Sequence, residues 1–468
     1  MSEYPGDRLN SFRHFEEKMR AAEMHPLIIT MFKRNYLQLL SGSTGTIARA
    51  QIDPIDEVTD AEQLEGYAAA GEEALAHTVV IKLNGGMGTS MGLEEAKSLI
   101  PVKDDLRFID IIARQIRHMQ TTYHDRLPLL LMNSFATHAD SLAALAAYPE
   151  LAGDLPPDFL QHRIPKVLAE NLSPAVVEGD EELEWCPPGH GDIYTALVTS
   201  GLLERLLAED IHYAFVSNAD NLGAVVDLDI LGYFATKRLP FMMEVADRTS
   251  ADRKGGHLAL LKDGRLTLRE SAQCPDDETG EFQDITLYRY FNTNSLWLDL
   301  RALKDMLSRY DGILPLPLIR NRKTLDPRDA ATPEVYQLET AMGAAISLFE
   351  KAAALRVPRS RFAPVKTTDD LLAVWSDAYV LTDDYRIVRN PARTLPHLDV
   401  VLDKKYYKFV SQLKERFPAG APSLLHCASL RIEGDARFGS GVLCRGDVHI
   451  RVPEGEIRRI DNNTVLED

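Results

Sequence analysis

The chain has 468 residues, of which 45% are hydrophobic and 26% charged, a composition typical of a soluble globular protein with two or three domains. Its formal net charge of −18 argues against a general nucleic-acid or anionic-membrane surface, which would carry an excess of basic residues. Any phosphate ligand must therefore be met by a local positive site.

Targeting and redox signals are weak. The sequence contains no apolar run long enough for a transmembrane helix, and its first residues are acidic and polar, unlike a signal peptide, which predicts a cytoplasmic protein. The four cysteines, Cys186, Cys274, Cys427 and Cys444, lie far apart without a C-x-x-C spacing. Neither a zinc site nor a disulfide framework is indicated.

Helical periodicity runs from Ser11 to about Leu40, and the turn-forming "SGSTGT" ends it, so the N-terminal part is expected to be helical. From Thr78 onward, strand-like runs such as "HTVVIKL" and "LPLLLMNS" alternate with helix-like runs such as "FIDIIARQIRHM", "HADSLAALAAY" and "DLDILGYFATK". This alternation is typical of βαβ units and predicts an α/β fold with a parallel sheet covered by helices.

The second half of the chain adds other elements. The stretch "KDGRL" predicts a β-hairpin, which would place an antiparallel patch on the sheet, and "LETAMGAAISLFEKA" over residues 338–352 is expected to return to helix. After the proline-rich and basic "RNPARTLPHLD", short β-branched pairs alternate with glycine turns. This spacing favours a separate C-terminal module built from short turns of a β-solenoid.

A glycine-rich stretch, "LNGGMGTSMG", follows the strand predicted from Thr78 to Leu83. Its glycines match neither the dinucleotide fingerprint G-x-G-x-x-G nor the P-loop. Glycines nevertheless let backbone N–H groups approach an anion closely, and Lys97 can bring a positive charge to it. The alternative interpretation is a tight strand–turn–helix connection with a solvated lysine.

Three further stretches carry residues suited to phosphate chemistry. In "PPGHGD", prolines and glycines surround His190 just before a predicted helix. In "SNADN", Asp220 stands at the carboxyl end of a predicted strand, where it can bind Mg²⁺. In "VPRSRFAPVKTTDD", Lys366 lies on a predicted proline-bounded strand before a helix start. Taken singly, these could be a turn histidine, a helix N-cap and a surface lysine. Their joint appearance favours a phosphate-handling site.

The sequence shows no nucleophile–base signature such as G-x-S-x-G, H-E-x-x-H or a catalytic Cys–His pair. A phosphate nucleophile needs no general base, because its second pKa of about 6 leaves it mostly dianionic at pH 7. The pattern therefore indicates transfer between two phosphates that fixed cations and Mg²⁺ hold in line.

The chain carries a series of longer motifs in this order: "LNGGMGTSMG…K", "MNSF", "PPGHGD", "VSNADNLGA", "KGG", "FNTNSLW", "QLETAMGAAI" and "VPRSRFAPVKTTDDLL". The motifs and their order resemble those of the eukaryotic-type UTP–glucose-1-phosphate uridylyltransferases, or UDP-glucose pyrophosphorylases. The resemblance runs from about residue 80 onward. The resemblance implies a Rossmann-like, GT-A-like nucleotidyltransferase domain with a mixed, mostly parallel sheet. It places an N-terminal helical segment at residues 1–75, the catalytic domain at 76–388, and a linker with a left-handed β-helix-like domain at 389–468.

The resemblance also implies a set of site residues. Uridine would be held by Leu83, Gly85, Gly86, Met132, Gln161 and Gly189, and the triphosphate by Lys97. Glucose 1-phosphate would be held by His190, Asn218, Gly256, Glu270, Asn292 and Asn294. Lys97, Lys366 and Asp220 would be catalytic, with Asp220 as the ligand of the Mg²⁺ cofactor. The implied partners are UTP, glucose 1-phosphate, UDP-glucose and pyrophosphate, with no nucleic acid and no membrane; a homo-oligomer is compatible with the resemblance.

The chain also departs from the family pattern. Ala96 replaces a common proline, Cys186 a frequent tyrosine, and His162 stands beside Gln161 where a small residue is common, which puts the fine shape of the uracil pocket in question. Two rival functions remain at this point: a uridylyltransferase that also accepts galactose 1-phosphate or N-acetylglucosamine 1-phosphate, and a nucleotide-sugar sensor without activity. The presence of Lys97, Asp220 and Lys366 argues against the sensor.

Overall fold

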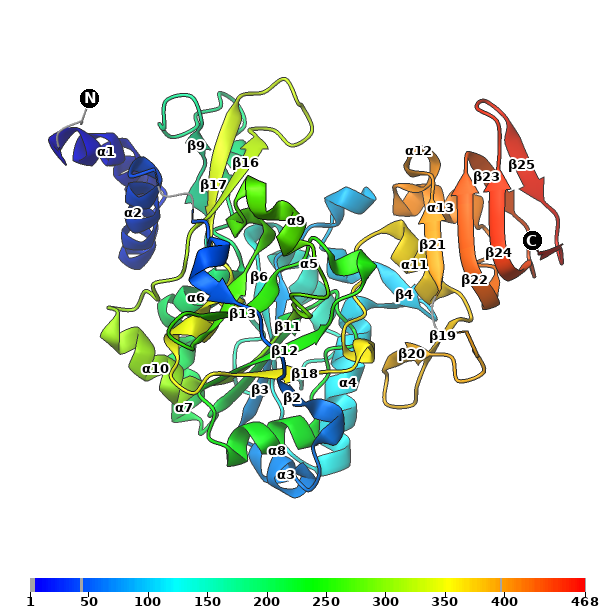
Figure 1. Cartoon of the computed structure of the whole chain (residues 1–468), viewed down its shortest axis with the longest axis horizontal. Coiled ribbons are helices and arrows are strands. Elements are labelled where there is room, and N and C mark those ends of the chain that lie inside the picture. Colours follow the sequence, from blue (N-terminus) through cyan, green and yellow to red (C-terminus); the bar gives the residue numbers. More distant parts are fainter. Residues whose placement is uncertain (1–4, 43–44, 396–397, 468) are drawn as a thin grey trace. The chain divides into compact units, whose positions relative to one another are not determined.

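The structure is a computed structural model that describes residues 5–42, 45–395 and 398–467 (Figure 1). The chain forms two compact units and passes between them several times. Unit 1 comprises Met1–Ile81, Phe159–Val216 and Val226–Pro358, and unit 2 comprises Lys82–Asp158, Ser217–Val225 and Arg359–Asp468. Strands β3 (Thr78–Asn84), β7 (Asp158–Leu160) and β11 (Tyr213–Asn218) therefore each begin in one unit and end in the other.

Unit 1 is built on a mixed sheet in which β2 (Thr59–Asp60), β18 (Ala353–Arg356) and β12 (Phe241–Asp247) pair in parallel. Strand β15 (Tyr290–Asp299) runs antiparallel to both β12 and β11. In the strand order β2-β18-β12-β15-β11, strands β2, β18, β12 and β11 thus point the same way and only β15 runs in the opposite direction. The predicted α/β class with a mostly parallel sheet is confirmed.

The "KDGRL" hairpin is also confirmed. Strands β13 (His257–Leu261) and β14 (Leu266–Arg269) pair antiparallel around it, and β13 further pairs with β15 and β1 (Ile52–Asp53). The remaining strands of unit 1 are β8 (Ile164–Pro165), β9 (Val167–Leu168), β10 (Trp185–Cys186), β16 (Ile319–Thr324) and β17 (Glu334–Glu339). Its helices from α3 onward are α3 (Ala68–Leu75), α6 (Ile193–Thr199), α7 (Leu202–Ala208), α8 (Leu228–Thr236), α9 (Thr279–Phe282) and α10 (Leu300–Arg309).

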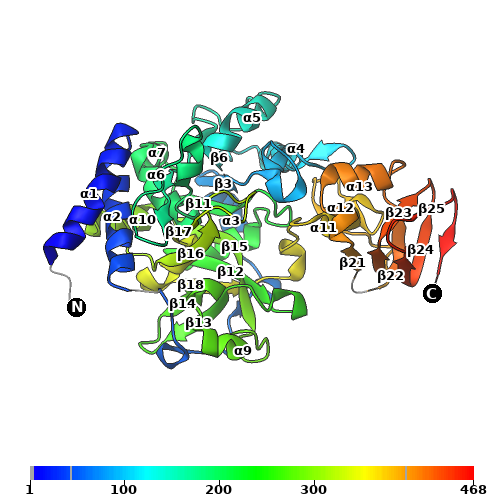
Figure 2. The same ribbon diagram turned by 90° about the horizontal axis from the view of Figure 1, so that it is seen from above.

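The region predicted to be helical at the N-terminus contains two helices, α1 (Pro5–Ala21) and α2 (Pro26–Leu40), which lie side by side (Figures 1 and 2). Pro26 starts α2, because a proline at the first helical position loses no hydrogen bond. Phe12, Phe15, Phe32 and Tyr36 are buried together with Ile164 and Leu338, which belong to the strands of unit 1. The helical pair is therefore part of the hydrophobic core of this unit.

Unit 2 has two regions. The first holds β4 (Pro101–Lys103), β5 (Leu106–Arg107), α4 (Phe108–Tyr123), β6 (Leu129–Asn133) and α5 (Phe135–Leu145). The second holds α11 (Thr368–Trp375), β19 (Tyr379–Leu381), β20 (Ile387–Arg389), α12 (Lys404–Tyr407), α13 (Val410–Arg416) and the strands that follow. Among the residues that the structure describes, no helix combines the length and the apolar character needed to cross a membrane.

The C-terminal strands pair in parallel. Strands β21 (Asp399–Leu402), β22 (Ser423–Glu433), β24 (Leu443–Arg451) and β26 (Val465–Leu466) form one sheet, and β23 (Asp435–Phe438) pairs with β25 (Ile457–Ile460). The short turns of a β-solenoid expected from the spacing of the tail stay a prediction.

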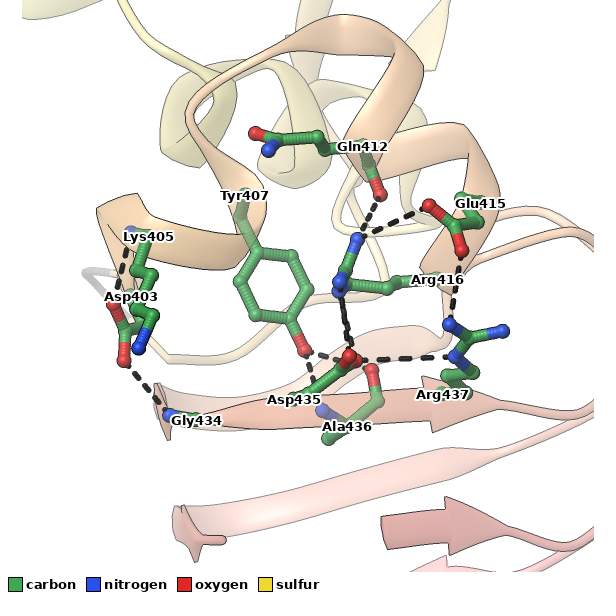
Figure 3. A network of polar contacts seen from close by, with 10 residues as sticks. All are labelled: Asp403, Lys405, Tyr407, Gln412, Glu415, Arg416, Gly434, Asp435, Ala436 and Arg437. Atoms are coloured by element: carbon green, nitrogen blue, oxygen red, sulfur yellow. Dashed lines mark hydrogen bonds and ion pairs between the residues drawn. The ribbon is translucent and has the colours of Figure 1, made fainter. Parts of the chain in front are cut away.

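Helices α12 and α13 are fixed to these strands by buried polar contacts (Figure 3). Arg416 binds both carboxylate oxygens of Asp435, at 2.9 Å from Nε and 3.0 Å from Nη2. Beside this pair, the Tyr407 hydroxyl donates to Ala436 O and accepts from Ala436 N, at 2.7 and 3.1 Å. The charged groups of Arg416 and Asp435 are nearly inaccessible to water, so each stabilises the other in the interior.

Two expectations are wrong. Residues 338–352 do not form an α-helix; β17 continues to Glu339, and Met342–Leu348 is a 3₁₀-helix. The backbone N–H groups at Thr340 and Met342 bond to Pro188 O and to the His190 ring instead of to a helix. Lys366 does not lie on a strand either, since only an isolated bridge joins Pro364 to Asn221, and Pro364 has no N–H with which to extend a ladder.

We predict that Asp435→Ala lowers the free energy of unfolding by about 3–5 kcal/mol, because it removes the bidentate partner of the buried Arg416 guanidinium and leaves as its counter-ion only the half-exposed Glu415, at 3.5 Å. Glu467→Ala is the matched control, since its partner Arg445 is half exposed, and it should cost no more than about 1 kcal/mol. Urea denaturation followed by circular dichroism measures both. Equal losses in the two variants would contradict the importance of burial.

Candidate functional site

The glycine-rich loop of unit 2 folds back so that its lysine meets its first glycines. Gly88 N donates to Glu95 O and Lys97 N donates to Gly86 O, both at 3.1 Å, while Met87 and Ala96 form a bridge. Gly88 packs so closely on Leu93 that a Cβ would lie 2.7 Å from its side chain. The loop therefore needs glycine at this position, and it places Lys97 directly beside Gly86.

Lys97 is paired with Asp220, the residue that the sequence places at the end of β11. Lys97 Nζ lies 2.6 Å from Asp220 Oδ2, and the two side chains are 16% and 21% exposed. The other carboxylate oxygen, Asp220 Oδ1, is buried and has no hydrogen-bond partner among the described residues. Because unsatisfied buried carboxylate oxygens are costly, Oδ1 is suited to receive a ligand such as a metal ion.

The segment that carries Lys366 runs along the same residues of unit 2. Val365 N donates to Asp220 O at 3.2 Å, and the Asn221 side chain binds Arg361 O and Ala363 N at 3.1 and 3.0 Å. The Lys366 side chain is exposed, and its backbone N donates to Asp370 at the start of α11. The fold thus joins Lys97 to Asp220 and brings the backbone next to Lys366 against Asp220.

The other predicted residues of unit 2 lie on the adjoining strand ends. Leu83 O, at the end of β3, accepts from Ala219 N at 3.0 Å, which places the glycine loop next to Asn218 and Asp220. Gly85 follows directly in the loop. Met132 is buried at the end of β6, and its neighbour Asn133 accepts a hydrogen bond from Asn84 at 2.7 Å.

In unit 1, Gln161, Gly189 and His190 come together around the loop that precedes α6. Gln161 Nε2 donates to Gly189 O at 3.0 Å. Gly189 has a φ of 81°, and a Cβ there would lie 2.4 Å from Thr340 O, so only glycine fits. Gly191 N donates to Thr340 O and Thr340 N to Pro188 O, which fastens the loop on its other side.

His190 is neutral at pH 7. Its Nδ1 accepts a hydrogen bond from Met342 N at 3.0 Å, and burial lowers its pKa to about 4. A neutral imidazole that accepts at Nδ1 carries its proton on Nε2. His190 can therefore donate a hydrogen bond to an anionic oxygen without adding a full charge.

The four residues expected to contact the sugar also cluster in unit 1. Asn292 N donates to Gly256 O at 3.0 Å, Asn292 Nδ2 donates to Asn294 Oδ1 at 2.8 Å, and a Cβ on Gly256 would lie 2.4 Å from the Glu270 carboxylate. Asn294 adopts a φ of 58°, a conformation that asparagine tolerates. Amide and carboxylate groups in this arrangement can bind hydroxyl groups.

Residues 340–343 are a part of this group to which the sequence reasoning gave no role. Thr340 and Met342 hold the loop of His190, and a Cβ on Gly343 would lie 3.1 Å from Asn292 Nδ2. These residues belong to the family motif "QLETAMGAAI", whose helix-like pattern gives no indication of this role. Lys82 was also missed: its buried Nζ donates to Ser217 Oγ and Ala224 O, both at 2.7 Å, and so ties down the segment that carries Asp220.

One group of three metal-type ligands occurs among the described residues: His77, Asp210 and His212. His77 precedes β3 and His212 precedes β11, so this group lies at the opposite ends of the two strands from Leu83 and Asn218. It is therefore distinct from the predicted metal ligand Asp220.

These features are typical of a nucleotidyltransferase. They are an α/β fold, a glycine loop closed by a lysine, a lysine–carboxylate pair with one unpartnered carboxylate oxygen, and a cluster of groups that can bind hydroxyls. The comparisons agree with this class. The family model for UTP–glucose-1-phosphate uridylyltransferase matches residues 29–445.

Two curated relatives carry that name. The one from Solanum tuberosum is 40% identical over 433 residues, covering 91% of this chain and 89% of the relative, and the probable one from Schizosaccharomyces pombe is 38% identical, covering 88% and 80%. A crystal structure of the Leishmania major UDP-glucose pyrophosphorylase G45Y mutant in complex with UDP-glucose has a TM-score of 0.90 at 41% identity, covering 98% of both chains. The chain belongs to the UTP–glucose-1-phosphate uridylyltransferase family, and it is an enzyme of the uridylyltransferase class.

We predict that His190 makes the protein less stable in acid. Its folded pKa of about 4 lies below the ordinary value of 6.5, so the unfolded state binds the proton more readily and stability falls as the pH drops from 6.5 to 4. His190→Asn keeps an acceptor for Met342 N but cannot titrate. Between pH 7 and pH 4.5, wild type should therefore lose about 2.5 kcal/mol more than the variant.

Urea unfolding at the two pH values measures this difference. His257 is also buried with a pKa lowered to about 3, but it is present in both proteins, so its contribution cancels. An identical loss in wild type and variant would show that His190 does not titrate as its burial requires.

Proposed function

We propose that this protein transfers the uridylyl group of UTP to glucose 1-phosphate, forming UDP-glucose and pyrophosphate. The observation that carries the proposal is the joining of Lys97, Asp220 and the Lys366 segment by direct contacts within unit 2. The relatives from Solanum tuberosum and Leishmania major are named for this activity or for this product.

The residues of unit 2 are assigned to the uridine and the phosphates. The loop of Gly85 and Gly86 offers bare backbone to the uridine, together with Leu83 and Met132. Lys97 contacts the triphosphate, and the exposed Lys366 stabilises the charge that spreads over the transferred phosphate and the departing pyrophosphate. Asn218, at the end of β11, contacts the phosphate of the sugar.

The residues of unit 1 are assigned to the base, the sugar and one phosphate oxygen. Gln161 and Gly189 bind uracil, because their amide and backbone groups can pair with its polar edge. His190 donates from Nε2 to a phosphate oxygen. Gly256, Glu270, Asn292 and Asn294 hold the glucose hydroxyls, and the missing Cβ at Gly256 leaves room for the Glu270 carboxylate.

The metal proposed is Mg²⁺, held by Asp220. The buried, unpartnered Oδ1 fits this ion, which usually binds to one or two protein carboxylates and completes its shell with water and substrate phosphates. When bound, Mg²⁺ would neutralise part of the phosphate charge.

The chemical step needs no enzyme nucleophile. A phosphate oxygen of glucose 1-phosphate attacks the α-phosphorus of UTP, the new P–O bond forms, and the bond to pyrophosphate breaks on the opposite side. The attacking phosphate is already ionised at pH 7, so no base has to remove a proton. Lys97 and Lys366 therefore act by position and charge.

Three further features belong to this proposal. The C-terminal parallel strands form a short left-handed β-helix-like module, as their repeated parallel pairing suggests. The enzyme works in the cytoplasm. A homo-oligomer is compatible with the family.

The test is pyrophosphate release from UTP and Mg²⁺ with a panel of sugar 1-phosphates, with ATP, GTP, CTP and dTTP as nucleotide controls. We expect turnover with UTP and glucose 1-phosphate and its loss when EDTA removes the metal. Equal rates with galactose 1-phosphate or N-acetylglucosamine 1-phosphate would overturn the sugar assignment. Binding of UDP-glucose without any turnover would instead indicate a sensor.

We predict that Lys97→Ala and Lys366→Ala each lower kcat by about 100-fold or more, because each removes a cation from the reacting phosphates. Lys262→Ala, which removes an exposed lysine paired with Asp53, should leave kcat unchanged. Steady-state kinetics with saturating substrates separate kcat from KM. Near-normal kcat in both site variants would refute the assigned roles.

A further inference from the structure

His162, one of three positions at which this chain departs from its family pattern, has a defined place in unit 1. Its ring Nδ1 lies 3.0 Å from both carboxylate oxygens of Asp192, and its backbone N donates to Asp192 Oδ2 at 2.8 Å. The other ring nitrogen, Nε2, lies 2.9 Å from Thr199 Oγ1 on α6. Both ring nitrogens are therefore engaged, one with the start of α6 and one with its end.

The partner carboxylate depends on this histidine. The Asp192 side chain is 0% exposed, and His162 is 17% exposed. A buried carboxylate needs hydrogen-bond donors to replace water, and His162 supplies donors from both its ring and its backbone. The contact fixes the main chain at residue 162 relative to the loop of residues 189–192.

This fixed contact adjoins the residues assigned to the base of the nucleotide. Gln161 precedes His162 in the chain, and its Nε2 donates to Gly189 O, which also accepts from Asp192 N at 3.2 Å. Gly189 has little room on the side of Thr340, because Thr340 O lies only 2.4 Å from where a Cβ of residue 189 would stand. The His162–Asp192 contact thus holds the residue after Gln161 against the loop that contains Gly189, and so it constrains the distance between Gln161 and Gly189.

We infer that His162 is a positioning residue for nucleotide choice: it holds Gln161 and Gly189 at the separation that distinguishes uracil from other bases. This inference rests on the proposed function, which assigns those two residues to uracil. His162 itself does not contact the substrate. A displacement of about 1 Å in such a pair is enough to weaken recognition strongly.

The test compares His162→Ala with His162→Asn, whose side-chain N–H can replace the donor at Nδ1. For His162→Ala we expect the KM for UTP to rise about 10-fold and the preference for UTP over CTP in kcat/KM to fall by about the same factor. The KM for glucose 1-phosphate should stay within about twofold of wild type. His162→Asn should restore most of the UTP preference.

His77→Ala is the matched control. His77 also pairs with an aspartate, Asp210, at 3.1 Å, but it lies at the far end of β3 and has no contact with the loop of residues 189–192. It should leave both KM values and the nucleotide preference unchanged.

Two results would overturn the inference. One is an unchanged KM for UTP and an unchanged UTP preference in His162→Ala. The other is an equal rise of both substrate KM values with no rescue by His162→Asn, which would indicate a merely structural role.

Calorimetric binding of UTP and CTP separates this inference from the proposed function. If wild type showed no turnover with glucose 1-phosphate, the function would fail, but a UTP preference in binding that His162→Ala loses would still support the positioning role. An absence of any UTP preference in wild-type binding would overturn the inference.

Discussion

The pairing of Lys97 with Asp220 is the constraint on which the arrangement of unit 2 depends. The lysine closes the glycine loop on Gly86, and the aspartate receives the segment of Lys366 through its carbonyl. Without a ligand, the two charges neutralise each other in a poorly hydrated place. Under the proposed function, a phosphate that carries a cation would offer one charge of each sign and so would leave neither residue without a counter-charge. The free Asp220 Oδ1 already presents a position for that exchange.

Unit 1 meets a different constraint, which is to hold Gln161, Gly189 and His190 in place. It does so with backbone hydrogen bonds between the loop of Gly189 and residues 340–342. These N–H groups precede or open the 3₁₀-helix of Met342–Leu348, so the loop supplies partners to groups that the helix itself leaves unpaired. Glycine at residues 189, 256 and 343 lets the pieces approach more closely than any side chain would allow. Close backbone approach thus takes the place of larger side-chain networks.

Much of the site was predictable from the sequence because its parts are local. The strand from Thr78, the glycine loop and the strand end at Asn218 follow from β-branched runs and glycine spacing, and the structure has them where expected. The contacts of Thr340, Met342 and Lys82 were not predictable. A lysine in a strand pattern reads as a surface charge, yet Lys82 is buried because Ser217 and Ala224 accept its hydrogen bonds. Such partners lie more than a hundred residues away in the chain.

By itself, the sequence determined the class of fold and the family, and it indicated the residues that we propose for phosphate chemistry, since short-range patterns and ordered motifs contain that information. Only the tertiary structure decided which of these residues touch. It paired Lys97 with Asp220, set His190 in its neutral form against Met342, and gave His162 a partner in Asp192. These outcomes depend on burial and on contacts between distant segments. Burial shifts the balance between charged and neutral forms, and no local pattern along the chain records it.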